Sequence, residues 1–177
     1  RSKSLTAMSQ WLADWKLEFS SDKCNSMEFF QRKDHCKYQR SYYLYGKKLK
    51  QVHEFKLLGV KLDENLTFDN HLDDIFTKAS KRLGHLRFHM YNASIRLKLK
   101  PYTIFYNTIV RSGLEYASEI WNVAKETSKK KLDLIQQKAI TTAYQLWPRT
   151  PKEICYTISC ICPLELRRQE KQISMYL

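Results

Sequence analysis

The sequence predicts an α+β protein that is mostly helical, in which a small antiparallel β strip is followed by a helical bundle. Glycine and proline are scarce, at four residues each, so the segments between chain breaks should be long and mainly helical. Apolar residues recur at helical spacing through most of the chain, whereas the patterns typical of strands are confined to the part before Asp63. A hydrophobic content of 43% with 13% aromatic residues can form a packed core and argues against disorder.

The part before Asp63 is expected to contain one helix and several short strands. Apolar residues from Leu5 to Trp15 recur at helical spacing and predict a helix that ends near Lys16. Short strands are expected at residues 27–30 and 42–45, with a turn at 46–48. The strongest strand pattern is in residues 55–62, where Leu58, Val60 and Leu62 would alternate onto one face.

Only helices are expected from residue 63 onward, so the sequence divides into a first domain, residues 1–62, and a second, residues 63–177. Thr67 or Asp69 can cap the first helix. Its apolar stripe consists of Leu72, Ile75, Phe76, Ala79, Leu83, Leu86 and Met90. Pro101 would take an early helical position that needs no N–H. Further helices are expected at residues 101–110, 114–121 and 128–146, and after Pro163, the last with Leu164, Leu166 and Ile173 inward.

The chain is strongly basic, with a formal net charge of +13, which points to a phosphate-bearing partner or an anionic surface. There is no acidic residue between Ile75 and Leu114. We predict nucleic-acid binding by the basic side chains of this stretch, namely Lys78, Lys81, Arg82, His85, Arg87, Arg96, Lys98 and Lys100. Among them lie Tyr91, Tyr102 and Tyr106, which could stack on bases. The alternative is a helix face that is merely solvated. The lysine run 129–131, at a helix N-terminus, could likewise bind a phosphate or be solvated.

Few residues offer catalytic or metal-binding chemistry. Asp73 and Asp74 form the one adjacent acid pair with apolar flanks, but neighbouring side chains on a helix diverge by about 100°. We therefore expect ordinary first-turn helix acids. Lys23 lies in a loop between a helix and a strand, where a lysine could protonate or neutralise a leaving phosphate, or be an ordinary surface residue. No metal ligand is predicted, because zinc-site spacing is absent from Cys24, Cys36, Cys155, Cys160 and Cys162.

Ordered motifs run along nearly the whole chain. The first motif consists of Trp15, Leu17, Phe19, Lys23, Cys24, Met27 and Phe29. Ser20 stands at a position of this motif that usually has an asparagine. Later motifs are Leu57-Leu58-Gly59-Val60, residues 114–118 with Trp121, and Pro163-Leu164 with Arg167-Arg168. In this order they resemble the reverse transcriptases of non-LTR retrotransposons of the jockey-like kind.

The resemblance implies that residues 1–62 are the C-terminal part of a reverse-transcriptase palm and that residues 63–177 are the helical thumb with the connection helices after it. Lys23 would be a candidate proton donor near the leaving pyrophosphate, and the primer grip would be Leu57, Leu58, Gly59 and Val60. The chain would begin after the catalytic Asp pair and would bind no cofactor itself, whereas the parent polymerase would need Mg²⁺. Its partners would be an RNA/DNA template–primer duplex and the missing upstream fingers and palm. Alone, it would be inactive.

Two other functions fit the same residues: a stand-alone basic nucleic-acid-binding remnant, and a protein-interaction module that uses exposed Trp and Tyr side chains. No apolar run is long enough to span a bilayer, so no membrane partner is expected. The basic residues at the start of the sequence are not followed by the apolar region of a signal peptide. The odd number of cysteines, five, is typical of reduced thiols. We therefore expect an intracellular protein, nuclear or cytoplasmic, that is not secreted. The lack of an initiator Met indicates a fragment or a processed chain.

Overall fold

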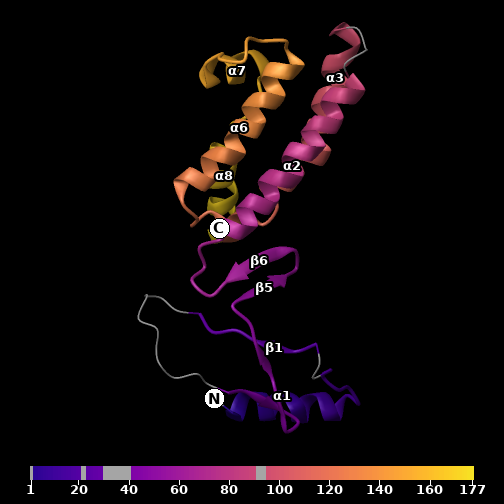
Figure 1. The fold of residues 1–177 in the computed structure, drawn as a ribbon, viewed down its shortest axis with the longest axis vertical. Coiled ribbons are helices and arrows are strands. Elements are labelled where there is room, and N and C mark those ends of the chain that lie inside the picture. Colours follow the sequence, from indigo (N-terminus) through magenta and orange to yellow (C-terminus); the bar gives the residue numbers. More distant parts are fainter. Residues whose placement is uncertain (1, 21–22, 30–40, 91–94) are drawn as a thin grey trace. The chain divides into compact units, whose positions relative to one another are not determined.

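The computed structural model describes residues 2–20, 23–29, 41–90 and 95–177, and the chain forms two compact units, Arg1–Leu66 and Thr67–Leu177 (Figure 1). Helices predominate and the strands are short, so the predicted α+β, mostly helical class is confirmed. The chain passes from one unit to the other between Leu66 and Thr67, whereas the sequence-based division follows residue 62. Within the described part of the chain, no helix combines the length and the apolar character needed to cross a membrane.

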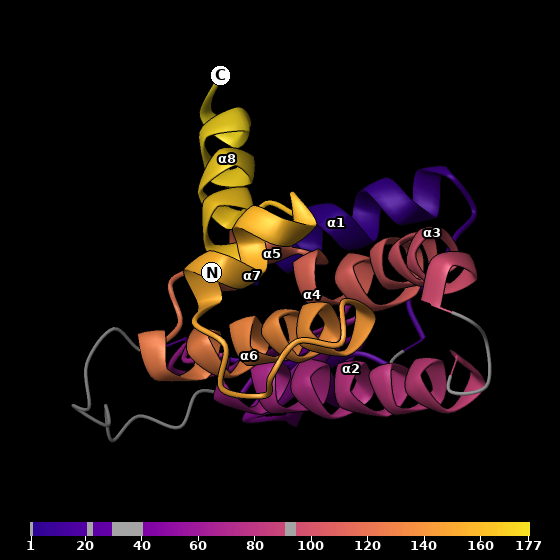
Figure 2. The ribbon, with the colours of Figure 1, turned by 90° about the horizontal axis from the view of Figure 1, so that it is seen from above.

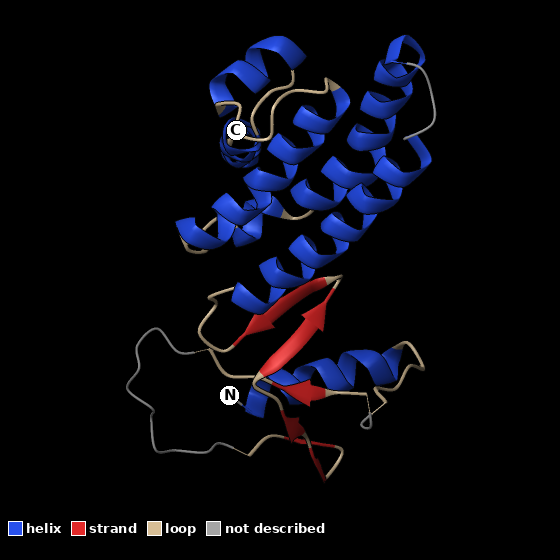
Figure 3. Cartoon of the chain, turned by 45° about the horizontal axis from the view of Figure 1, so that its top comes forward, coloured by secondary structure: helices blue, strands red, loops and turns tan. Residues whose placement is uncertain are grey.

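The first unit contains one helix and separate pairs of short strands, which Figure 3 draws in red. Helix α1 spans Ser2–Asp14. The strand pairs are β1 (Asn25–Ser26) with β4 (Lys50–Gln51), β2 (Tyr43–Leu44) with β3 (Lys47–Lys48), and β5 (Glu54–Leu57) with β6 (Val60–Asp63). The second and third pairs are antiparallel, as predicted, but β1 and β4 are parallel. A parallel pair needs a long connection, and the chain between these two strands provides one.

The segment predicted as one strand, residues 55–62, is a hairpin instead. Its turn residues Leu58 and Gly59 both have positive φ, 47° and 92°, which reverses the chain between β5 and β6. The expected alternation on one face therefore fails at Leu58, which lies in the turn. Residues 27–29 follow β1 without joining a strand, and Phe30, also predicted in a strand, lies outside the described residues.

The apolar stripe predicted for α1 is only partly buried. Leu12 is buried, whereas the larger side chains Met8, Trp11 and Trp15 are more than half exposed. The rings of Trp11 and Trp15 lie together, with centroids 6.1 Å apart. The first unit thus carries a large apolar helix face that is open to solvent.

The second unit is a helical bundle in which the long helices α2 and α6 lie side by side (Figure 2). In chain order its elements are α2 (Asp69–Met90), α3 (Ile95–Phe105), the π-helix η1 (Tyr106–Arg111), α4 (Ser112–Glu115), α5 (Ser118–Trp121), α6 (Glu126–Ala143), α7 (Lys152–Ser159) and α8 (Leu164–Tyr176). The stripe predicted for α2 is buried at Leu72, Ile75, Ala79, Leu83 and Leu86, whereas Phe76 is half-buried and the side chain of Met90 lies outside the described residues. Its partner stripe on α6 consists of Leu132, Ile135, Ala139 and Ile140.

Other helices of this unit differ from the sequence-based expectation. Pro101 lies inside α3 rather than at its start, since α3 begins at Ile95, and the ring removes one backbone N–H donor there. The helix expected over residues 114–121 is divided into α4 and α5, because Ala117 is left-handed with φ 52°. Helix α7, which was not expected, follows Pro151 and ends at Ser159, before Cys160, another left-handed residue with φ 51°.

Helix α8 follows Pro163 as expected, but it buries charge rather than a continuous apolar stripe. Leu164 is buried, whereas Leu166 and Ile173 are exposed, so the inward orientation predicted for those two is wrong. Arg168 is buried in their place, and its two terminal nitrogens donate to the carboxylate of Asp133 on α6 at 2.8 and 3.2 Å. A bidentate partner allows an arginine to occupy a position that periodicity assigns to an apolar residue.

A second buried charge, Glu115, joins α4 to α8 and η1. Its carboxylate accepts hydrogen bonds from Arg167, and it lies 3.7 Å from Lys171 Nζ and 3.6 Å from Arg111 Nε. Lys171 also donates to the Glu115 carbonyl at 3.2 Å. The side chain of Glu115 is only 8% exposed, so these cations replace the water it has lost.

Buried polar side chains also hold the turns around this cluster. The indole Nε1 of Trp121, which is fully buried, donates to the Tyr116 carbonyl at 2.8 Å and spans the break between α4 and α5. The amide of Gln136 donates to the Cys162 carbonyl and accepts from the Leu164 N–H, at 3.0 and 2.9 Å. The start of α8 is thereby fixed against α6.

We predict that Glu115→Gln destabilises the helical unit by about 2 kcal/mol, because three cations lose their common counter-charge in a largely buried site. Urea unfolding followed by far-ultraviolet circular dichroism measures the change. The matched control is Glu119→Gln, whose carboxylate lies 3.9 Å from Lys171 and is more exposed. This control should stay within about 0.5 kcal/mol of the unsubstituted chain. Equal effects of the two substitutions would contradict the role given to Glu115.

Candidate nucleic-acid interface

The residues predicted as a primer grip form the tip of the β5–β6 hairpin. Leu57 and Val60 are the last cross-strand pair, and Leu58 and Gly59 make the two-residue turn between them. Val60 is buried, whereas Leu57 is half exposed and Leu58 is 84% exposed. The structure therefore brings all of these residues together and presents the Leu58 side chain at the end of a β-hairpin.

The conformation of Leu58 is unfavourable for a leucine. A branched side chain in the left-handed region costs about 1 kcal/mol, and two-residue turns of this kind usually have asparagine, aspartate or glycine at the first position. Strained residues of this sort collect where a side chain is needed for contact. Local stability alone would favour a different residue at position 58.

Lys23 lies on the turn that precedes β1. Its backbone N–H donates to the Ser20 carbonyl at 3.0 Å, and its side chain is exposed. Lys23 was predicted in a loop between a helix and a strand. The structure agrees, since α1 ends at Asp14 and β1 begins at Asn25.

The basic residues predicted on α2 do not all share one environment. Lys78, Lys81 and His85 are exposed and, by helical spacing, lie on the side opposite the buried stripe. Lys78 Nζ lies 3.8 Å from Asp74. Arg82, in contrast, turns toward η1, where its Nη1 donates to the Ile109 carbonyl at 2.9 Å.

Gly113 makes the position of Arg82 possible. A Cβ atom at residue 113 would lie 2.7 Å from Arg82 Nη1, closer than side-chain atoms approach. The sequence pattern gave no indication of this contact, because it joins residues far apart in the chain.

The remaining predicted cations lie elsewhere. Arg87 is exposed at the end of α2, where its charge acts on the hydroxyl of Tyr102. Lys100 is exposed on α3. The side chains of Arg96 and Lys98 lie outside the described residues.

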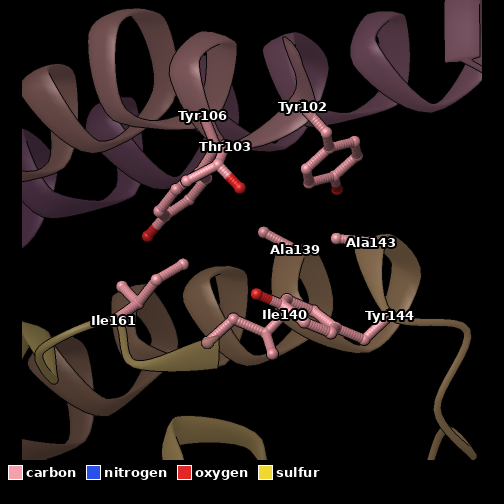
Figure 4. Close-up of a pocket in the computed structure, with 8 residues that line it drawn as sticks. All are labelled: Tyr102, Thr103, Tyr106, Ala139, Ile140, Ala143, Tyr144 and Ile161. Atoms are coloured by element: carbon pink, nitrogen blue, oxygen red, sulfur yellow. The ribbon is translucent and has the colours of Figure 1, made fainter. Parts of the chain in front are cut away.

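The tyrosines expected to stack on bases are core residues instead. Tyr102 and Tyr106 are 3% and 1% exposed, and they line a small pocket between α3, η1 and α6 (Figure 4). Burial raises the pKa of Tyr102 to about 12, against the opposing effects of Arg87 and Thr142, and it also raises the pKa of Tyr106. Apolar side chains of α6 form the opposite wall of the pocket. Both rings are therefore packed between helices and are not exposed for stacking on bases. Tyr91 lies outside the described residues.

Asp73 and Asp74 are held apart by separate lysines. Asp73 accepts a hydrogen bond from Lys131 on α6 at 3.1 Å, whereas Asp74 lies near Lys78 on its own helix. Both are in the second turn of α2, which begins at Asp69, rather than in the first turn as expected. Among the described residues, no group of three His, Cys, Asp or Glu side chains could hold a metal ion.

The lysines at the start of α6 are matched by acids. Lys125 donates to Asp69 at 2.9 Å, which raises the pKa of Lys125. Lys129 is buried and donates to the Asn122 carbonyl at 3.0 Å. A second hydrogen bond, from Lys129 to the Glu126 carboxylate, lowers the pKa of Glu126. These contacts compensate the cations that the helix dipole disfavours. The Lys125–Asp69 contact also connects the start of α6 to α2.

Comparison with known proteins finds similarity to RNA-directed DNA polymerases from mobile elements. The chain is 28% identical over 136 residues to the RNA-directed DNA polymerase from mobile element jockey of Drosophila funebris, covering 77% of the chain and 14% of the relative. It is 25% identical over 139 residues to the jockey polymerase of Drosophila melanogaster, with the same coverage. It is 26% identical over 130 residues to the probable RNA-directed DNA polymerase from transposon X-element of that species.

The resemblance to jockey-like reverse transcriptases is confirmed by these similarities, which extend over about three quarters of the chain. The chain spans about 14% of the length of the curated relatives it matches. No model of a protein family matches the chain, and no solved structure matches it.

We predict that Leu58→Asn stabilises the β5–β6 hairpin, because asparagine adopts the left-handed conformation at lower cost. Amide hydrogen exchange in the β5–β6 ladder should slow by about fivefold, the factor that corresponds to roughly 1 kcal/mol. The control is Gly59→Ala, which should speed exchange because φ is 92° there. Faster exchange in Leu58→Asn would show that the leucine is not strained.

Proposed function

We propose that this relative of jockey-type RNA-directed DNA polymerases is a piece of a retrotransposon reverse transcriptase that grips the primer end and the template–primer duplex. The observation that carries the proposal is the exposed, strained tip of the β5–β6 hairpin, where Leu58 presents an apolar surface at a conformational cost. An apolar side chain on a rigid two-residue turn suits contact with the sugar and base at the end of a primer strand.

Helix α2 would contact the backbone of the duplex. Lys78, Lys81 and His85 are exposed on its outward side, in a stretch without acidic residues from 75 to 114. Phosphate contacts of this kind position a duplex without reading its sequence. Arg82, oriented by the Ile109 carbonyl, retains further N–H donors for the same phosphates.

Catalysis would belong to other parts of the parent polymerase. Nucleotide transfer uses Mg²⁺ ions held between converging carboxylates. Asp73 and Asp74 do not fit such ions, since Lys131 holds one and Lys78 lies beside the other. The metal would be held by upstream fingers and palm segments, and Lys23 would neutralise the leaving pyrophosphate beside it.

Helix α1 would dock those upstream segments. The exposed Met8 and Trp11, with Trp15 directly after the helix, give it an apolar face larger than a solvated helix needs. This observation also favours a second candidate function, a protein-interaction module. That function predicts partner binding that hardly responds to salt, unlike phosphate contacts.

We predict that the double variant Lys78→Ala, Lys81→Ala weakens binding to an RNA/DNA hybrid and reduces its dependence on salt. The slope of log affinity against log salt concentration should fall by about 0.9 for each lysine. Fluorescence anisotropy titrations at several salt concentrations measure it. The control variant Lys138→Ala, Lys152→Ala removes two exposed lysines from α6 and α7 and should leave the slope unchanged. Equal slopes in both variants would refute the proposed duplex contact.

We also predict that the chain does not extend a primer. Incubation with a primed template, dNTPs and Mg²⁺ should give no longer product on a denaturing gel, because the carboxylates of Asp73 and Asp74 are separated. A parallel reaction with a competent reverse transcriptase checks that the primer can be extended. Robust polymerisation by the chain would overturn this part of the proposal.

A further inference from the structure

The β2–β3 hairpin of the first unit has a strained tip like that of β5–β6. Tyr45 and Gly46 form its turn, with φ 49° and 75°. Leu44 is buried beside the turn, whereas Tyr43 and Tyr45 are 58% and 56% exposed. A bulky aromatic residue therefore takes a conformation better suited to asparagine, and its ring projects into solvent.

Lysines share the outward face of this hairpin. Tyr43 pairs with Lys48 across the strands, so both lie on the face opposite the buried Leu44. The Leu49 N–H donates to the Tyr42 carbonyl at 2.8 Å and continues the hairpin, and Lys50 begins β4 immediately afterwards. Lys48 and Lys50 are exposed, and residues 41–53 contain no acid.

Lys23 lies at the same end of the β1–β4 pair. Asn25, the first residue of β1, pairs with Lys50 in parallel register, and Lys23 lies two residues before β1. Two segments that are distant in the sequence thus bring Lys23 and Lys50 to the end of the pair where both strands begin.

We infer that this surface, defined as Tyr43, Tyr45, Lys48 and Lys50, binds a single-stranded stretch of nucleic acid. Lysines alone would suit any phosphate backbone. Exposed aromatic rings beside them suit unpaired bases, because bases outside a duplex offer free faces for stacking. The lysines would hold the phosphates on either side of the stacked bases. This surface lies in the first unit and does not depend on the duplex contact proposed for α2.

The test compares two nucleic acids with the full chain. One is a fluorescent, unstructured RNA of about 12 nucleotides, within the length that such sites cover. The other is a blunt RNA/DNA hybrid. The double variant Tyr43→Ala, Tyr45→Ala should lose at least about tenfold in affinity for the single strand. Tyr43→Phe, Tyr45→Phe keeps both rings and should stay within about twofold, since stacking needs no hydroxyl. Binding to the hybrid should not change in either variant.

A third variant separates stacking from damage to the hairpin. Tyr45→Asn should stabilise the turn, seen as slower amide exchange in β2 and β3, and should nevertheless weaken single-strand binding. The variant Lys48→Ala, Lys50→Ala should reduce the salt slope for the single strand by about 0.7 per lysine.

The outcomes distinguish this inference from the proposed function. Unchanged single-strand binding in the Tyr→Ala variant, or an equal loss on the hybrid, would overturn the inference. If the Tyr→Ala variant loses single-strand binding and the unsubstituted chain does not bind the hybrid, the inference is supported and the duplex contact is refuted. A chain that binds neither nucleic acid would refute both.

Discussion

The carboxylate of Glu115 is buried and has to be neutralised, and the arrangement of η1, α4 and α8 follows from that requirement. Arg111, Arg167 and Lys171 approach it from two sides of the bundle. Arg168 then reaches Asp133 from the next position along α8. Removing Asp133 would leave Arg168 buried without its counter-charge, and removing Glu115 would leave three cations without theirs. The short helices α4 and α5 have too few residues to be stable without such tertiary contacts.

Among the described residues, the cations behind the net charge of +13 include two populations in different environments. One population is structural and is matched to acids between helices, as with Lys125 to Asp69 and Lys131 to Asp73. The other projects outward from α2 and from the β2–β3 hairpin. Composition alone cannot separate the two, and only the second is suited to phosphate.

The sequence predicts those parts of the fold whose signal is local and periodic. The buried stripe of α2 was predictable because apolar residues repeat along one face of a long helix. The hairpin at Leu58 was not, because a leucine in a left-handed turn violates the usual turn chemistry. Leu166 and Ile173 were assigned inward because they are apolar residues of a helix, whereas the burial of Arg168 depends on Asp133, which is distant in sequence. Periodicity also cannot tell a buried tyrosine from an exposed one, which explains Tyr102 and Tyr106.

The burial of Trp121 has a spectroscopic consequence. Trp121 is fully buried, whereas the other tryptophans, Trp11, Trp15 and Trp147, are more than half exposed. Its indole is shielded from a dissolved quencher such as iodide, and the other rings are not. Emission that survives the quencher therefore reports the junction of α4 and α5 alone, so an optical probe of the helical unit is already present in the natural chain.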